Sequence, residues 1–411
     1  MINWLAALLI LSRLFLPFGS FMAGDAGRLA TQSKPAVEFL DIETSYQFGQ
    51  QVTFQATITT TQSSIANVVI YITPAGQATS WRTAVLSANN TVNEVIPAGD
   101  LSLRPFTQIA YRYQVNLADG KSVTSDEFFF RYDDDRFEWQ KLESLQFRIF
   151  WYGREPVFGQ DVLNIAQTGM KNARGILDVQ PPAPINLYVY LTSRDLQTAL
   201  SMDNQPWIAG HASPDLDQVM ISIPAGPEQN LELERQIPHE LMHILQYQLV
   251  GDALAKQPVW LLEGLASIAE LYPNPEYQYV LTEAAKHDLL PFRDLCTSFP
   301  REASSAYLAY AQSESFTRFL YQKFGSSGLL ALITRYQDGM GCDEGMNAAF
   351  GSGLGQLEYS WKQEVLGINA AGLALRNLAP YLLVVVLLVI PAGLALLPPA
   401  LRKSSGGAAI G

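Results

Sequence analysis

The pentapeptide His239-Glu240-Leu241-Met242-His243 constrains the fold of this chain more than any other segment. Two of the chain's four histidines lie in it, four positions apart. Residues at this spacing share one face of an α-helix, so both imidazoles can reach a single metal ion. Glu240 lies one residue round the turn from His239 and can reach a water molecule beside that metal. This H-E-x-x-H pattern predicts His239 and His243 as zinc ligands and Glu240 as a general base.

Pro238 directly precedes His239. Proline inside a helix removes one backbone hydrogen bond and clashes with the preceding turn. The helix is therefore expected either to begin near Ile237, with Pro238 at its first position, or to be kinked there. Both options keep the two imidazoles on one face. The two remaining histidines, His211 and His287, are interpreted as surface or capping residues.

A catalytic zinc ion needs three protein ligands and one open position. The segment 258–266 reads as the start of an apolar helix that carries one acidic residue, Glu263. A glutamate on such a face is rare unless it is paired or bound to a metal. It follows His243 by 20 residues, which allows a helix, a turn and a second helix packed beside the first. We therefore predict Glu263 as the third ligand. Glu270, seven residues further on, either accepts a hydrogen bond from a ligand histidine or faces solvent.

The chain from 36 to 133 is predicted to be an immunoglobulin-like β-sandwich. Apolar and polar residues alternate in 51–59 and 109–117, as they do in half-buried strands. Asp119-Gly120 is a strong signal for a two-residue hairpin. About seven short strands in roughly 100 residues fit a sandwich. A spacer is the favoured role, with a docking module as the alternative, and the acidic run 133–135 is interpreted as a solvated turn at the domain boundary.

The segment 137–368 is predicted to be an α+β domain. Strands are expected at 145–151, 185–190 and 217–223, and a helix at 160–177. Beyond Leu231 the pattern is helical almost to the last apolar segment. A small sheet followed by a helical lobe is typical of an α+β fold.

Both ends of the chain are apolar. Residues 1–26 are predicted to be a signal peptide or a signal anchor. The uncharged run 378–401 is 24 residues long and can cross a bilayer core of about 30 Å as one transmembrane helix. Arg402 and Lys403 follow it, so 402–411 is expected to be a cytoplasmic tail. The body between these segments is then extracytoplasmic, at the cell membrane.

Composition limits the partners and the redox chemistry. The formal net charge of −12, with no dense Lys/Arg patch, excludes nucleic-acid binding. Cys296 and Cys342 are too few for a disulfide scaffold. They form either one bridge, if the domain is exported, or two buried thiols.

The pentapeptide at 239–243 together with Trp260-Leu-Leu-Glu-Gly-Leu-Ala266 resembles the gluzincin zinc metallopeptidases, the group of thermolysin and aminopeptidase N. The bacterial peptidase MA-like proteins are the most similar of these, and the resemblance covers roughly 137–366. It implies that Glu263 binds zinc. It also implies a tyrosine that stabilises the oxyanion, which we assign to Tyr310 in Tyr310-Ala-Gln-Ser313, before a helix at 314–324, with Tyr307 as the runner-up.

Two further expectations follow from the resemblance. The G-x-M-E-N segment by which aminopeptidases hold a free amine is absent from the sequence, which favours an endopeptidase over that kind of exopeptidase. The strand at 217–223 stands where gluzincins pair the substrate backbone with a sheet edge.

These observations together predict a membrane-anchored zinc metallopeptidase that hydrolyses peptide or protein substrates, with Glu240 as the general base. The alternatives are an inactive zinc-binding module for surface interactions and a structural envelope protein in which the motif is a coincidence.

Overall fold

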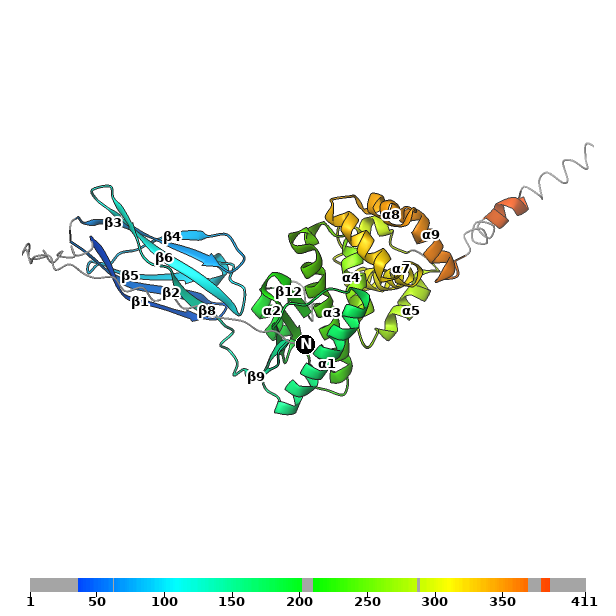
Figure 1. The fold of residues 1–411 in the computed structure, drawn as a ribbon, viewed down its shortest axis with the longest axis horizontal. Helices are drawn as coiled ribbons and strands as arrows, with labels where there is room; N and C mark the ends of the chain where they lie inside the picture. The colour runs from blue at the N-terminus through cyan, green and yellow to red at the C-terminus, as the bar shows by residue number, and fades with distance from the viewer. Residues whose placement is uncertain (1–35, 62, 202–209, 287–288, 369–377, 385–411) are drawn as a thin grey trace, which may run out of the picture.

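A computed structural model provides the coordinates of the chain, and it describes residues 36–61, 63–201, 210–286, 289–368 and 378–384. In Figure 1 the strands of the N-terminal part lie at one end of the molecule and most of the helices lie at the other. A mixed sheet and helix α2 lie between them. The predicted signal segment 1–26 and tail 402–411 lie outside the described residues.

The N-terminal part consists of two antiparallel sheets. One sheet has the order β1-β2-β5, formed by Val37–Gln47, Gln51–Thr60 and Thr91–Pro97. The other has the order β4-β3-β6-β7, and β8 also pairs with β6. Its strands are β3 (Ile65–Pro74), β4 (Ser80–Ala84), β6 (Thr107–Leu117), β7 (Ser122–Thr124) and β8 (Phe128–Tyr132). Side chains of both sheets share one buried core, in which Phe54 of β2 meets Tyr111 of β6 edge to face. The N-terminal part is therefore a β-sandwich, and its immunoglobulin-like character stays a prediction.

The acidic run 133–135 is not simply a solvated turn, because the side chain of Asp134 is fully buried. Arg136 donates two hydrogen bonds to its carboxylate, at 2.8 and 2.6 Å, and the Tyr190 hydroxyl donates a third at 3.0 Å. A buried carboxylate needs such partners, since desolvation would otherwise cost several kcal/mol. The charge of the run predicts exposure, whereas the partners that bury Asp134, one of them 56 residues away, come together only in the fold.

The strands that follow form one mixed sheet with the order β12-β13-β11-β10-β9. Their bounds are Gly210–Ser213, Gln218–Ser222, Ile185–Tyr190, Phe147–Trp151 and Gln140–Glu143. The pairs β10–β11 and β11–β13 are parallel, whereas β9–β10 and β12–β13 are antiparallel. The predicted strands at 145–151, 185–190 and 217–223 are thus present, with the ends shifted by at most two residues.

Each face of this sheet is covered by a different part of the chain. Val219 and Ile221 of β13 pack into the core of the helical lobe, whereas Met220 packs into the core shared with the sandwich. This division follows from the alternation of side chains along a strand. On the sandwich side, Phe106 stacks on Tyr188 at a centroid distance of 3.7 Å. The sandwich therefore packs directly against the sheet.

Helices other than α2 cover the other face and build the C-terminal lobe, whereas Leu196 and Ala199 of α2 pack into the core shared with the sandwich. α1 (Pro156–Ile176) connects β10 to β11, and α2 (Ser193–Leu200) follows β11. The lobe is formed by α3 (Gln229–Val250), α4 (Val259–Ala269), α5 (Pro275–Ala284), α6 (Phe292–Leu295), α7 (Ala303–Gln337), α8 (Cys342–Phe350) and α9 (Leu354–Glu364). Short 3-10 turns lie at Ala98–Asp100, Pro214–Leu216 and Gly251–Lys256. The helical lobe after the sheet agrees with the predicted α+β pattern.

Among the residues that the structure describes, no helix is both long enough and apolar enough to span a bilayer. The predicted transmembrane run 378–401 lies largely outside them. Its described part, 378–384, is helical, and the side chains of Leu378 and Tyr381 are exposed.

Cys296 and Cys342 form a disulfide bridge, which settles the alternative left open by the sequence. The bridge lies beside the first turn of α4. The Val259 amide donates to the Cys296 carbonyl at 3.2 Å, and the Trp260 indole N–H points at the Cys342 sulfur at 3.5 Å. The bridge therefore fixes the start of the helix that carries Glu263.

We expect the double substitution Cys296→Ser and Cys342→Ser to lower the free energy of unfolding by about 4 kcal/mol. The bridge closes a loop across a sequence separation of 46 residues, and a loop of this length restricts the unfolded chain by about that amount. Thermal or denaturant unfolding of both proteins measures the difference. A reductant should destabilise the wild type and leave the variant unchanged; equal stability of the two proteins under oxidising conditions would contradict the prediction.

Candidate metal centre and active site

Helix α3 runs without interruption from Gln229 to Val250, with Pro238 inside it. The expectation that Pro238 occupies the first helical position is therefore wrong. Pro238 has no N–H to donate to the Glu234 carbonyl, and that carbonyl instead accepts from the Leu271 amide at 2.9 Å. This bond attaches the chain just after α4 to α3, next to Glu270. The proline thus helps to bring the end of α4 beside His239.

His239, His243 and Glu263 lie together, as the sequence predicts. Each offers one ligand atom, and these three atoms lie within 4.8 Å of one another. Glu263 Oε2 is 3.4 Å from His239 Nε2 and 3.9 Å from His243 Nε2. Two neutral imidazoles and one carboxylate form the donor set of a gluzincin zinc site, so these side chains fit such an ion.

The other ring nitrogen of each histidine has its own hydrogen-bond partner. His239 Nδ1 is 3.1 Å from Glu270 Oε1, and His243 Nδ1 is 2.9 Å from Gln246 Oε1. Gln246 is itself held by its bond to the Leu262 carbonyl at 2.9 Å. Acceptors at both Nδ1 atoms favour a proton there and direct each Nε2 toward the metal position. Glu270 is almost fully buried, which decides against a solvent-facing role.

Gln246 is a contributor that sequence reasoning missed. It lies three residues after His243 on the same helix, and this spacing alone makes it a candidate partner. Nothing in the sequence separates it from other polar residues of α3, however, because its role depends on the Leu262 carbonyl of another helix.

Glu240, Glu263 and Glu270 surround His239, and their negative charge favours a positive charge at this position. Burial alone would lower the pKa of His239, but its bonds to Glu263 and Glu270 raise it well above the usual histidine value. Burial also tends to raise the pKa of Glu263, yet the hydrogen bond with His239 and the nearby His243 keep it below the usual value. The site therefore favours a cation, and a bound metal would take the place of the proton on His239.

A cavity of about 290 Å³ opens over this cluster. His239, Glu240, Glu270 and Tyr310 line it, and Glu240 is 8% exposed. The cavity thus brings together the predicted base, one ligand histidine, the orienting carboxylate and the predicted tyrosine. A substrate that entered it would meet all of them.

Tyr310 lies inside α7 and not before a helix at 314–324, because α7 already begins at Ala303. Close packing of α7 on α4 brings it to the metal cluster. A methyl group on Gly264 would overlap the Ser313 carbonyl oxygen, so only glycine permits this approach. The charge of Glu263, followed by burial, raises the pKa of Tyr310 well above the usual tyrosine value. The phenol therefore keeps its proton at neutral pH and can donate it in a hydrogen bond.

Tyr307, the runner-up, also lines the cavity. Its hydroxyl already donates to Glu276 Oε2 at 3.0 Å. Tyr310 instead lies close enough to Glu263 for the charge of that carboxylate to raise the pKa of its hydroxyl. This difference favours Tyr310 over Tyr307 as the group that faces a reacting carbonyl.

The sheet edge beside the metal cluster is β12 and not the strand predicted at 217–223. That strand, β13, is paired on both sides, with β11 and with β12. Within the described residues β12 pairs with β13 alone and is therefore the edge strand of this sheet. The short β12 segment Gly210–Ser213 has too few residues for a clear alternation, which is why sequence reasoning passed over it.

His211 of β12 is half-buried and lies in a strand, so it is not a capping residue. It lies in the edge strand, and burial lowers its pKa below the usual value, with Glu240 and His243 among the charges that act on it. Its imidazole is therefore neutral near pH 7. His287 lies outside the described residues.

Gly210 lies directly against the carboxylate of Glu240, and a methyl group there would overlap Glu240 Oε1. We expect Gly210→Ala to displace the carboxylate and to lower kcat by about 10²-fold, the effect of misplacing a catalytic group by about 1 Å. Folding and zinc content should not change, because the flexible end of one side chain absorbs the overlap.

Steady-state peptide cleavage and zinc analysis check this expectation. Gly226→Ala serves as the matched control, because Gly226 is exposed and a methyl group there meets no atom within 4 Å. If both variants cleave at the wild-type rate, Gly210 has no part in placing Glu240.

Comparisons with known proteins give the family. The family model described as the Peptidase MA superfamily matches residues 165–367. No curated protein matches the chain. Among solved structures, an aminopeptidase N family protein from Idiomarina loihiensis is similar with 10% identity and a TM-score of 0.37, covering 82% of this chain and 75% of that protein.

A polysaccharide deacetylase from Bacillus cereus is similar with 9% identity and a TM-score of 0.21, covering 41% of this chain and 57% of that protein. The matched region of the family model contains α3, α4 and α7, and so includes the H-E-x-x-H pentapeptide, Glu263 and Tyr310. Residues 165–367 of this chain are therefore a gluzincin-like metallopeptidase domain of the Peptidase MA superfamily.

Proposed function

We propose that this protein is a membrane-anchored, extracytoplasmic zinc metallopeptidase that cleaves polypeptides at internal peptide bonds. One observation carries the proposal: His239, His243 and Glu263 converge beside a cavity that Glu240 and Tyr310 also line. A domain that only stored zinc would not need a buried base and a protonated tyrosine facing the same space.

In the proposed reaction, His239, His243 and Glu263 hold the zinc ion. When bound, zinc supplies Lewis acidity, which lowers the pKa of a water molecule to about 7 and polarises a carbonyl group. Glu270 and Gln246 keep both imidazoles oriented through their Nδ1 atoms.

Glu240 performs the proton transfers. It takes a proton from the attacking water and later delivers it to the leaving amine. Tyr310 donates a hydrogen bond to the negative charge that develops on the carbonyl oxygen. Gly210 leaves the space that the Glu240 carboxylate occupies.

Cleavage at internal bonds is supported by the edge strand β12. An extended polypeptide can add to this edge by main-chain hydrogen bonds and then passes the metal cluster. The sequence also lacks the G-x-M-E-N segment that would hold a free amine.

An extracytoplasmic location is supported by the disulfide between Cys296 and Cys342, since such bridges persist in oxidising compartments. The apolar runs at 1–26 and 378–401 support export and anchoring of the same body.

The full chain, purified in detergent, tests the proposal through zinc content and cleavage of a peptide library. We expect about one zinc per chain and internal cleavage that a chelator abolishes and added zinc restores. Stoichiometric zinc without cleavage would mean an inactive zinc-binding module. Absence of zinc would mean that the motif has no metal function.

A further inference from the structure

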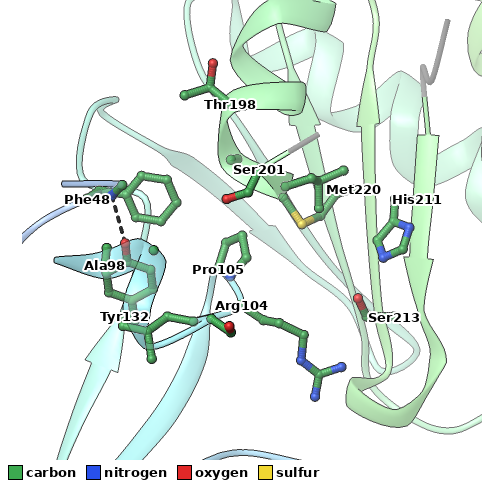
Figure 2. A pocket seen from close by; sticks show the side chains of 16 residues that line it. Phe48, Ala98, Arg104, Pro105, Tyr132, Thr198, Ser201, His211, Ser213 and Met220 are labelled. Atoms are coloured by element: carbon green, nitrogen blue, oxygen red, sulfur yellow. Dashed lines mark hydrogen bonds between the residues drawn. The ribbon is translucent and has the colours of Figure 1, made fainter. Parts of the chain in front are cut away.

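A second cavity, of about 390 Å³, lies between the sandwich and the mixed sheet. Figure 2 shows His211, Ser213 and Met220 on one wall, facing Phe48, Pro105 and Arg104 of the sandwich. This volume is within the usual range of ligand pockets, about 300–1,000 Å³. The sandwich supplies more than half of the lining residues, so the cavity exists only where the two parts meet.

The two cavities lie on opposite sides of the edge strand β12, and neighbouring residues of this strand line them. Gly210 lines the cavity over the metal cluster, whereas His211 lines the cavity beside the sandwich. Successive residues of a strand face opposite sides of the sheet. A polypeptide added to the edge of β12 obeys the same alternation, so its side chains point in turn toward the metal side and toward the sandwich side.

The walls of the second cavity are held in place by contacts between the sandwich and the sheet. Arg104 donates to both carboxylate oxygens of Asp215, at 3.0 and 2.8 Å. Gln218 donates to the Pro105 carbonyl at 3.3 Å. Phe106, which follows Pro105 in the chain, stacks on Tyr188 of the sheet. The described walls of the cavity are therefore fixed by contacts within the fold.

Among the residues that the structure describes, those that line the cavity carry no unpaired charge. Arg104 is neutralised by Asp215, and the half-buried His211 is uncharged near pH 7, since desolvation lowers its pKa. Phe48, Leu103 and Met220 contribute apolar surface, and the hydroxyls of Ser102 and Thr198 contribute polar groups. Such a lining suits a neutral, largely apolar group. A charged group would lose its hydration without gaining an opposite charge.

We propose that this cavity binds a neutral apolar side chain of a polypeptide substrate whose backbone pairs with β12, and that the sandwich thereby selects the substrate. The inference rests on the proposed peptidase function. It gives the sandwich a role in specificity in place of the spacer role expected from the sequence.

Two substitutions fill the cavity from opposite sides. Gly99 of the sandwich and Thr198 of α2 both line it and are exposed, so they lie at its rim. A side chain built on Gly99 meets no atom within 4 Å, and its backbone is not in the left-handed region. Gly99→Phe and Thr198→Phe should therefore fold normally. Gly175→Phe is the matched control, because Gly175 is exposed on α1 and also has open space around it.

The test is positional scanning of a peptide library with the full chain and these three variants. At one position near the cleaved bond, we expect the wild type to prefer leucine over alanine by about tenfold or more in kcat/KM, as apolar pockets do. Both filling variants should reduce this ratio to about twofold or less, and Gly175→Phe should keep it. The same peptide pair, measured for binding to each protein in a Glu240→Gln background, should show the same loss of discrimination.

Other results would overturn either this inference alone or the proposed function as well. If the wild type cleaves but the filling variants keep its preferences, the inference is wrong and the proposed function stands. A preference for a charged residue that the filling variants abolish would contradict the neutral lining. A wild-type chain that holds no zinc and cleaves nothing would overturn the proposed function and this inference with it.

Discussion

The Glu240→Gln variant is expected to bind zinc as the wild type does and to cleave peptides about 10²- to 10⁴-fold more slowly, the usual contribution of a general acid–base group. The glutamine keeps the shape of the side chain beside Gly210 but cannot accept a proton. Glu240 is not one of the three side chains that converge as metal ligands, so the metal should stay bound.

Zinc analysis and kcat/KM for one library-derived peptide measure this effect. Glu234→Gln is the matched control, because it makes the same change on the same helix, at a residue that does not line the cavity. A Glu240→Gln variant with the wild-type rate would remove Glu240 from the mechanism. Loss of zinc in that variant would instead make Glu240 a ligand.

The Glu263→Ala variant is expected to lose both zinc and activity. Its carboxylate is the acidic member of the donor set, and it lies within 4 Å of both ligand imidazoles. Alanine leaves two neutral ligands, which are too few for a stable zinc site. The loss of affinity should exceed the about 10- to 100-fold effect typical of a residue that only orients a ligand.

Titration against a chromophoric chelator measures the zinc affinity of each protein. Glu270→Gln provides the comparison, since Glu270 contacts His239 through Nδ1 and lies outside the donor set. We expect Glu270→Gln to weaken zinc binding by about 10- to 100-fold, and Glu263→Ala to weaken it more. If the two variants lose affinity equally, Glu263 is not a direct ligand.

Parts of the site that depend on local spacing could be predicted from the sequence. His239, His243 and Glu240 need only an α-helix to take up their positions, and α3 is that helix. Glu263 could be found because an acidic residue in an apolar helix needs a partner. The strand at 185–190 was predicted with the bounds of β11, since its buried residues are nearly all apolar or aromatic.

Other parts depend on contacts between distant segments. Pro238 predicts a helix start or a kink; the helix start is wrong, since α3 runs through Pro238 while the Leu271 amide satisfies the Glu234 carbonyl. The acidic run predicts that Asp134 lies in solvent, yet Tyr190 and Arg136 hold it in the interior. Such partners cannot be read from local patterns, because the chain segments meet only after folding.

The sequence by itself determined which residue types could form the site: two imidazoles and a glutamate at helical spacing, a further glutamate downstream, and apolar runs at both ends. Periodicity and residue type carry this information, since each depends on a few neighbouring residues. The tertiary structure alone decided which described strand lies at the sheet edge, which glycine makes room for Glu240, and that the sandwich forms a cavity behind His211. These features arise from strand order and from the packing of the sandwich on the sheet, which join residues about 100 positions apart, as in the bond between Arg104 and Asp215.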